Sequence, residues 1–214
     1  MHVSVPPNET LLLDLTLVRH GQSYGNVPLN GNPMPHLVPL DERPPHVETG
    51  RVCDDWCLTP MGEQQADYLG RFLADTAFDQ VICSHLQRAQ STAQAVLKHQ
   101  PKPVELRIEP EVCEIYDCGS DDPEQWKARA LRAARMLRGD CPPGSRVLVV
   151  AHGGFNCYLL HALLDIPKQP LLWLWQHNTA RNRILFHRRE DGELQVRLVH
   201  MNELSHLPKE CTTA

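Results

Sequence analysis

The chain has 214 residues and a mass of 24.3 kDa, the size of one ordinary globular domain. Hydrophobic residues make up 42% and charged residues 22% of it, so it has enough apolar material for a core and does not resemble a disordered chain. The formal net charge of -5 at pH 7 excludes the overall basic character of a general nucleic-acid binder.

Eight cysteines would permit four disulfides, but that arrangement is typical of short secreted chains. The first ten residues lack the basic segment of a secretory signal, and the apolar stretch 11–18 is interrupted by Asp14 and Thr16. No run approaches the ~20 apolar residues that cross a bilayer. We therefore expect a cytoplasmic protein with mostly reduced thiols and with neither a membrane nor a nucleic acid as partner.

Apolar periodicity and capping signals predict strands and helices that alternate along the chain. The expected strands are residues 11–18, 78–83, 104–108, 146–150, 183–187 and 194–200. The expected helices are residues 60–75 after an N-cap at Thr59, 84–96 from a capping box of Ser84 and Gln87, 122–137, and 153–164. Asp191-Gly192 predicts a hairpin between the last two strands. The four arginines within 181–189 are expected to form a solvated face of an edge strand.

This alternation predicts an α/β fold, a three-layer α/β/α sandwich with a mainly parallel sheet, as a single domain over residues 1–214. Polar residues follow three of the predicted strands: Arg19 and His20, Ser84 to Arg88, and His152. Sites in parallel sheets form beyond the carboxyl ends of the strands. We therefore expect these residues to converge.

The segment 27–57 contains six prolines and no sustained periodicity. A loop of that length is either a functional lid or disordered. Cys53 and Cys57, with His46 nearby, have a spacing that zinc can accept. No second ligand pair is evident, however, so we expect neither a metal nor any other cofactor.

Four segments, in order, resemble the motifs of the histidine phosphatase superfamily, the phosphoglycerate mutase-like proteins. They are Leu17 to Asn26 with its Arg-His-Gly triplet, Leu58 to Ala66, Val81 to Ala93, and Val149 to Gly154 with its second His-Gly pair. The resemblance covers roughly residues 11–207. It implies a phosphoglycerate mutase-like fold and a phosphomonoesterase that acts through a phosphohistidine intermediate on a small phosphorylated metabolite.

By this resemblance His20 is the phosphorylated residue, and Arg19, Arg88 and His152 form the phosphate pocket. Asn26 falls where family members often place a further phosphate donor, and Ser23 and Thr59 are secondary candidates. The chemistry agrees with this assignment, because neutral imidazole is an available nucleophile at pH 7. Arginine forks can bind the equatorial oxygens of a transferring phosphoryl group. The remaining histidines His85, His161 and His177 have no such support, and we expect them to be hydrogen-bonded or exposed.

Departure of the alkoxide requires an acid, and the family places a Glu after the strand that corresponds to residues 104–108. Glu114 fits that spacing, with Glu111 as the alternative. The Glu-Arg-x-Tyr-Gly run of the mutases is absent.

Two other functions stay open: a phosphoglycerate-type mutase, and a catalytically silent phosphate-binding or interaction protein. Gly25 stands where mutases commonly carry Trp, and only 37 residues separate Glu114 from His152, where the mutases insert a large capping segment. These departures favour the phosphatase. The sequence leaves open the physiological substrate and whether the chain forms a homodimer.

Overall fold

The computed structural model describes residues 8–27, 56–115, 122–166 and 172–214. A six-stranded sheet runs through the molecule in the order β3-β2-β4-β1-β5-β6. Its strands are β1 (Glu9–Arg19), β2 (Gln80–Cys83), β3 (Leu106–Ile108), β4 (Ser145–Ala151), β5 (Arg181–Arg189) and β6 (Leu194–Glu203). The strands β3, β2, β4 and β1 are mutually parallel, whereas β5 is antiparallel to both β1 and β6.

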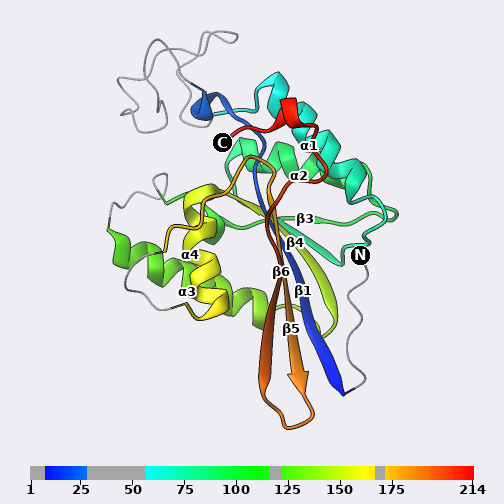
Figure 1. Ribbon diagram of the computed structural model, residues 1–214, viewed down its shortest axis with the longest axis vertical. Coiled ribbons are helices and arrows are strands. Elements are labelled where there is room, and N and C mark those ends of the chain that lie inside the picture. Colours follow the sequence, from blue (N-terminus) through cyan, green and yellow to red (C-terminus); the bar gives the residue numbers. More distant parts are fainter. Residues whose placement is uncertain (1–7, 28–55, 116–121, 167–171) are drawn as a thin grey trace.

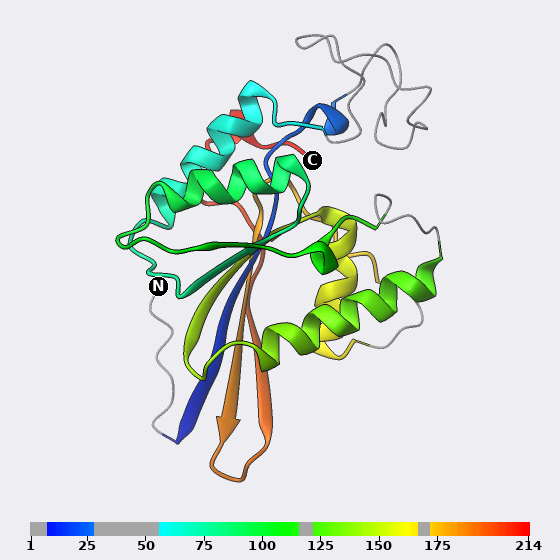
Figure 2. The ribbon, with the colours of Figure 1, turned by 180° about the vertical axis from the view of Figure 1, so that it is seen from behind.

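Four helices cover the two faces of the sheet (Figure 1). They are α1 (Pro60–Phe72), α2 (Gln87–Leu97), α3 (Pro123–Gly139) and α4 (Gly153–Leu164). The connecting segments contain three short 3-10 helices among the described residues: η1 (Tyr24–Asn26), η4 (Pro110–Val112) and η5 (Lys209–Cys211). Helices α1 and α2 lie on one face and α3 and α4 on the other, as the reverse view also shows (Figure 2). The predicted three-layer α/β sandwich with a mainly parallel sheet is confirmed.

Each face of the sheet has its own apolar core. One cluster packs Leu69 of α1 and Ala93 of α2 against Val81 and Val150 of the sheet. The other is larger and packs α3 and α4 against the opposite face. Alternate residues of β1 and β4 enter different clusters, as the two-residue period of a strand requires. The central strands are thereby held on both sides, which fixes the position of the residues that follow them.

Two local predictions are wrong. Helix α2 begins at Gln87 with Leu86 as its N-cap, and the Ser84 hydroxyl accepts from the backbone N–H of Leu86 instead of closing a capping box. Strand β5 is not an edge strand, because β6 covers it. Its arginines divide accordingly: Arg183 makes a bidentate contact with Asp14, with distances of 2.9 and 2.8 Å, whereas the last two residues of the strand are exposed.

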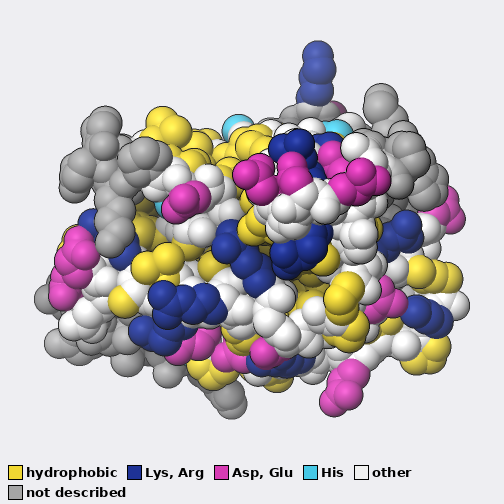
Figure 3. Space-filling view, turned by 90° about the horizontal axis from the view of Figure 1, so that it is seen from below, with side chains coloured by type: hydrophobic (Ala, Val, Ile, Leu, Met, Phe, Trp, Pro, Cys, Tyr) yellow, Lys and Arg dark blue, Asp and Glu magenta, His cyan; other side chains and the backbone are white. Residues whose placement is uncertain are grey.

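The end of the molecule at which β1 begins lies opposite the carboxyl ends of the parallel strands. Seen from that end, Lys and Arg side chains alternate with Asp, Glu and apolar side chains (Figure 3). No extended patch of one charge sign is visible there among the described residues. None of the described helices is both long and apolar enough to cross a membrane.

Candidate active site

Three chain segments meet beyond the carboxyl ends of the central strands. β1 and β4 are paired in register up to Arg19 and Ala151, and the backbone N–H of His20 donates to the carbonyl of Ala151 at 2.9 Å. β2 is paired with β4 up to Cys83 and leads into α2, whose first turn carries Arg88. The parallel sheet therefore places His20, Arg88 and His152 at one edge.

The hydrogen bonds of His20 fix its tautomer. Its Nδ1 lies 2.6 Å from the carbonyl oxygen of Gly21, which can only accept, so Nδ1 carries the proton. Its Nε2 accepts from Nε–H of Arg88 at 3.3 Å and therefore holds a lone pair. The ring is almost fully buried, so it has little freedom to turn. This arrangement presents Nε2 as a nucleophile, and the Arg88 guanidinium lies beside it.

His152 packs edge-on against His20, with ring centroids 5.1 Å apart. The ring is fully buried, and neither of its nitrogens has a hydrogen-bond partner among the described residues. Burial, followed by the positive charge of Arg88, holds the pKa of His152 well below its usual range. The ring is therefore neutral at pH 7 and has one N–H to donate and one lone pair. Buried polar atoms seldom go without a partner, and an oxyanion beside His20 would provide one.

Arg19 is the last residue of β1, and a backbone carbonyl oxygen of the segment before β5 holds its guanidinium. Its Nη1 donates to the carbonyl oxygen of Gln176 at 2.6 Å, and a Cβ on Gly153 would come within 3.3 Å of its Nε. Burial lowers the pKa of Arg19 to about 10, Glu114 opposes that shift, and Arg88 adds to it. The guanidinium stays charged at pH 7. Two arginine cations thus lie close together, which favours an anionic ligand.

Asn26 has a fixed amide orientation. Its Oδ1 accepts from the backbone N–H of Ser23 at 3.1 Å and from Nδ2 of Asn178 at 3.2 Å. With Oδ1 committed to these donors, the Asn26 Nδ2 group faces away from them. Asn178 also donates to the carbonyl oxygen of His20 at 3.2 Å, so a single buried amide orients both the candidate phosphate donor and the loop of the candidate nucleophile.

Glu114 and Glu111 have different surroundings. Oε1 of Glu114 accepts from the backbone N–H groups of Ile115 and Phe155, both at 2.8 Å, while Oε2 accepts from the backbone N–H of Gly154 at 3.3 Å. The carboxylate therefore lies at the N-terminus of α4, two residues beyond His152. Glu111 instead forms an ion pair at 3.2 Å with Arg132 of α3. The structure brings Glu114 to the site and directs Glu111 away from it.

The secondary candidates Ser23 and Thr59 are engaged in local structure. The Thr59 hydroxyl caps α1 by accepting from Gly62 N at 3.0 Å and donates to Oε1 of Gln22 at 2.8 Å. A Cβ on Gly62 would lie only 1.9 Å from the Gln22 carbonyl oxygen, so the loop after β1 rests directly on the start of α1. The Ser23 hydroxyl bonds Oδ1 of Asn26 at 3.2 Å. Both hydroxyls support the candidate nucleophile loop.

Sequence motifs did not identify Gln176, Asn178 and Thr179, which lie between α4 and β5. Thr179 has a φ of 56°, a conformation that is costly for a β-branched residue. Its backbone N–H donates to the carbonyl oxygens of Arg19 and His20 at 3.0 and 3.2 Å. No motif marks these residues, because most of their contacts with the site run through backbone atoms. Arg129 was also missed; it donates to the carbonyl oxygens of Cys113 and Glu114 at 2.8 and 3.3 Å and so positions the candidate acid.

His206 contacts Thr179, and its lowered pKa predicts that the stability of the fold depends on pH. Its Nε2 lies 3.1 Å from the Thr179 hydroxyl, and burial, followed by the charge of Arg181, lowers the pKa of His206 to about 4. Between pH 6.5 and about pH 4 the unfolded chain binds a proton here that the folded chain does not, so stability falls as the pH is lowered through that interval. At ~1.4 kcal/mol per pKa unit, we expect a loss of ~3 kcal/mol in the free energy of unfolding. Urea denaturation of wild type and His206→Gln at several pH values checks this, and the same pH dependence in both proteins would contradict it.

The residues considered as metal ligands in the sequence, His46, Cys53 and Cys57, lie only in part within the described residues. Within the described ranges, no group of three or more His, Cys, Asp or Glu side chains is placed to hold a metal ion. Cys53 and His46 lie outside the described residues, as does most of the segment 27–57 that was considered as a lid. The three histidines without a predicted role in the site are exposed or hydrogen-bonded, as expected. His85 is exposed, His161 bonds the carbonyl oxygen of Leu172, and His177 bonds Asn202.

A family sequence model for the histidine phosphatase superfamily (branch 1) matches residues 15–119 and 114–200. The chain belongs to the histidine phosphatase superfamily. The matched range holds all of the residues that converge at the carboxyl edge of the sheet. The predicted family is confirmed.

Curated relatives of this superfamily member carry phosphatase names. The adenosylcobalamin/alpha-ribazole phosphatase of Escherichia coli is 44% identical over 144 residues, which cover 53% of this chain and 70% of the relative. The mitochondrial serine/threonine-protein phosphatase PGAM5 of Xenopus tropicalis is 23% identical over 171 residues, covering 71% of this chain. The match spans 59% of that relative's length.

Solved structures show the same fold. A mutant of phosphoserine phosphatase from Entamoeba histolytica, in complex with phosphoserine, superposes with a TM-score of 0.66 at 19% identity, covering 92% of this chain and all of that one. Several structural neighbours are complexes with phosphorylated molecules or phosphate. Phosphatase names therefore recur among both the sequence relatives and the structural neighbours.

Proposed function

We propose that the chain is a phosphomonoesterase that acts through a phosphohistidine at His20 on a small phosphorylated metabolite, without a metal. The observation that carries the proposal is the pair of hydrogen bonds made by the His20 ring, from which its tautomer follows. With Nδ1–H held by Gly21 and an Arg88 guanidinium at Nε2, the lone pair that must attack phosphorus lies next to a cation that can bind the phosphoryl oxygens. Positioning and charge stabilisation are the main requirements of phosphoryl transfer.

In the first step Nε2 of His20 attacks phosphorus and the P–O bond to the alcohol breaks. Arg19, Arg88 and the N–H of neutral His152 bind the equatorial oxygens, and Nδ2 of Asn26 adds a donor. The departing alkoxide takes its proton from Glu114. The Gly21 carbonyl stabilises the positive charge that develops on the His20 ring, because Nδ1–H already donates to it.

In the second step water attacks phosphorus and the P–N bond breaks. Glu114, now a carboxylate, accepts a proton from that water, as microscopic reversibility requires. Inorganic phosphate leaves and His20 returns to its starting tautomer. The chain thus needs no second phosphoryl acceptor.

A mutase would use the same residues but must return the phosphoryl group to a second hydroxyl before water reaches it. Gly25, where mutases carry Trp, packs here against Trp56, and a Cβ on Gly25 would lie 2.9 Å from that indole ring. The position is therefore already filled by another part of the chain. This packing supports the phosphatase over the mutase.

A substrate panel tests the function and separates the alternatives. Phosphorylated metabolites are scored for phosphate release, and 3-phosphoglycerate with a bisphosphoglycerate primer is followed for both isomer exchange and release. We expect release from at least one monoester without exchange. Exchange that far outruns release would establish the mutase, and neither reaction with any compound would leave the silent phosphate binder.

A further inference from the structure

The segment that leads from α4 to β5 carries two exposed indole rings. Trp173 and Trp175 are 43% and 55% exposed, whereas Trp56 and Trp126 are buried in the fold. Tryptophan is among the side chains that gain most from removal from water, so two such rings at the surface within three residues are unusual. Leu172, just before them, is also exposed.

The backbone of this segment is fixed against α4. The Leu172 carbonyl lies 2.7 Å from Nε2 of His161, and the backbone N–H of Leu174 lies 3.4 Å from Sγ of Cys157. Leu174 packs against the larger core cluster, and the two tryptophans that flank it stay exposed. The exposure of the indoles is therefore a property of an anchored segment.

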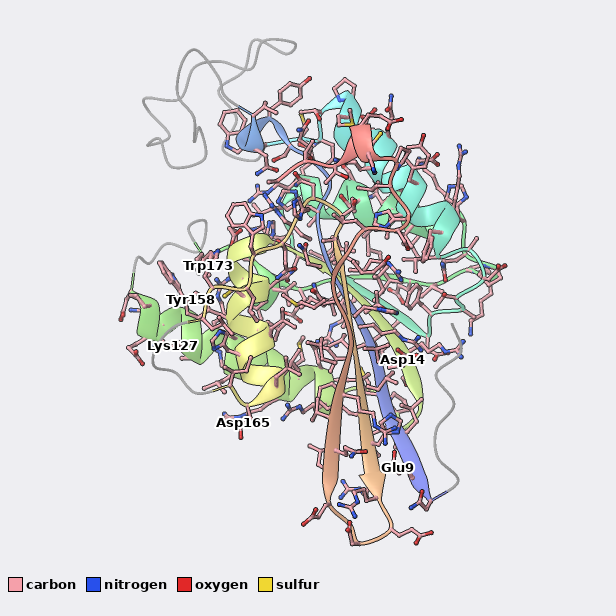
Figure 4. The ribbon with its side chains drawn as sticks, in the orientation of Figure 1. Glu9, Asp14, Lys127, Tyr158, Asp165 and Trp173 are labelled. Atoms are coloured by element: carbon pink, nitrogen blue, oxygen red, sulfur yellow. The ribbon has the colours of Figure 1, made fainter. Side chains whose placement is uncertain are left out.

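The anchors also set the direction of the segment relative to the site. His152 directly precedes α4, and of the two anchoring residues Cys157 lies closer to the start of that helix than His161 does. Next along the segment, the carbonyl oxygen of Gln176 accepts from Arg19 at 2.6 Å. The segment therefore runs along α4 toward the candidate phosphate site and reaches it one residue after Trp175. Consecutive Cα atoms lie ~3.8 Å apart, so the Trp175 backbone is next to the group that holds Arg19. Trp173 lies on the same side of the sheet as α4 (Figure 4).

We propose that Trp173 and Trp175 bind an aromatic ring in the alcohol portion of the substrate, so that the enzyme prefers phosphomonoesters of alcohols that carry such a ring. This inference rests on the proposed phosphatase function and deepens it. With phosphorus held at Arg19, Arg88 and His20, the alcohol must extend away from that cluster. Trp175 is an exposed apolar side chain that directly precedes Gln176, whose carbonyl oxygen holds Arg19. Indoles favour offset or edge-to-face contact with a planar ring.

The test compares ethyl phosphate with 2-phenylethyl phosphate, which share a primary alkoxide leaving group and differ in the ring. We expect kcat/KM to favour the phenylethyl ester by ~10-fold, on the scale of burying one ring. Trp175→Ala and the Trp173→Ala/Trp175→Ala double variant should remove most of that preference, through KM, and change ethyl phosphate turnover by less than ~2-fold. Leu198→Ala, which removes a side chain of similar exposure from β6, is the matched control and should keep the preference.

Binding of both esters to His20→Ala, measured by calorimetry, separates this inference from the proposed function. One outcome is that the wild type hydrolyses neither ester, while the phenylethyl ester binds more tightly than ethyl phosphate and loses that advantage when Trp175→Ala is added. That outcome would support the ring site and contradict the proposed phosphatase function. Equal turnover and equal binding of the two esters overturn the ring site, as does an equal loss on both esters in the variants. A change of oligomeric state in Trp175→Ala, seen by size exclusion, would also overturn it, because the indoles would then belong to an interface between copies.

Discussion

Replacement of His20 by alanine is expected to lower kcat/KM for any hydrolysed monoester by ~10⁴-fold or more, because it removes the atom that forms the covalent bond. Brief incubation of wild type with a ³²P-labelled substrate should give a label that is lost in acid and kept in alkali, as expected of a phosphoramidate. The variant should give none. Denaturation of the quenched protein before analysis distinguishes the covalent label from bound phosphate.

His99→Ala is the matched control, since His99 lies beyond the end of α2 remote from Arg88 and pairs with Asp67 at the surface. It should keep both label and turnover. Label that persists in His20→Ala would move the nucleophile elsewhere, and His152, the other histidine of the cluster, would be the next to test. Turnover without label in both proteins would indicate direct attack by water.

The convergence of His20, Arg88 and His152 could be predicted because it depends on a rule about parallel sheets. Each residue follows a strand whose apolar run is legible in the sequence, and parallel strands end at one edge. The order of the strands in the sheet could not be predicted from the sequence in the same way. Four arginines in nine residues suggested a solvated edge, but β6 pairs outside β5, and Arg183 finds Asp14 on β1, 169 positions away in the sequence.

The supporting residues of the site could not be predicted, because their identity matters less than their position. Thr179 bonds the candidate nucleophile loop through its backbone N–H, and Gln176 receives Arg19 on its carbonyl oxygen. Neither contact constrains the side chain enough to leave a motif. The positive φ of Thr179 could not be predicted either, because backbone positions with positive φ are usually occupied by glycine or asparagine. Asn178 is the exception, because its amide is used, but nothing in the sequence pairs it with Asn26.

The choice between Glu111 and Glu114 shows what the structure adds to the spacing. The two residues are three positions apart, and the family pattern alone left both open. Arg132 holds Glu111 against α3, while Gly154 and Phe155 hold Glu114 at the start of α4. A Cβ on Gly154 would lie 2.7 Å from Oε1 of Glu114, so that glycine is what lets the carboxylate approach. This placement supports the proposed acid role of Glu114 over Glu111.

Glu114→Gln is expected to slow the hydrolysis of an alkyl phosphate by ~10²-fold or more, the usual contribution of a general acid. Among the described residues, Oε1 accepts two short backbone hydrogen bonds and Oε2 accepts one longer bond, so Oε2 is the oxygen from which we expect the alkoxide to take its proton. Glutamine can keep the oxygen that accepts the two short bonds but has no acidic proton to give. For p-nitrophenyl phosphate, whose phenolate leaves without protonation, the loss should be much smaller.

Comparison of the two esters therefore separates chemistry from damage to the site. A glutamine that merely disturbed the start of α4 would slow both esters alike, because Arg19 and His152 adjoin that turn. Glu111→Gln, which breaks only the pair with Arg132, is the matched control and should leave both rates within ~2-fold of wild type, as surface ion pairs contribute little. A larger effect from Glu111→Gln on the alkyl ester would transfer the acid role to Glu111. An equal loss on both esters in Glu114→Gln would leave that carboxylate a structural cap of α4, and the leaving group would then have to take its proton from water.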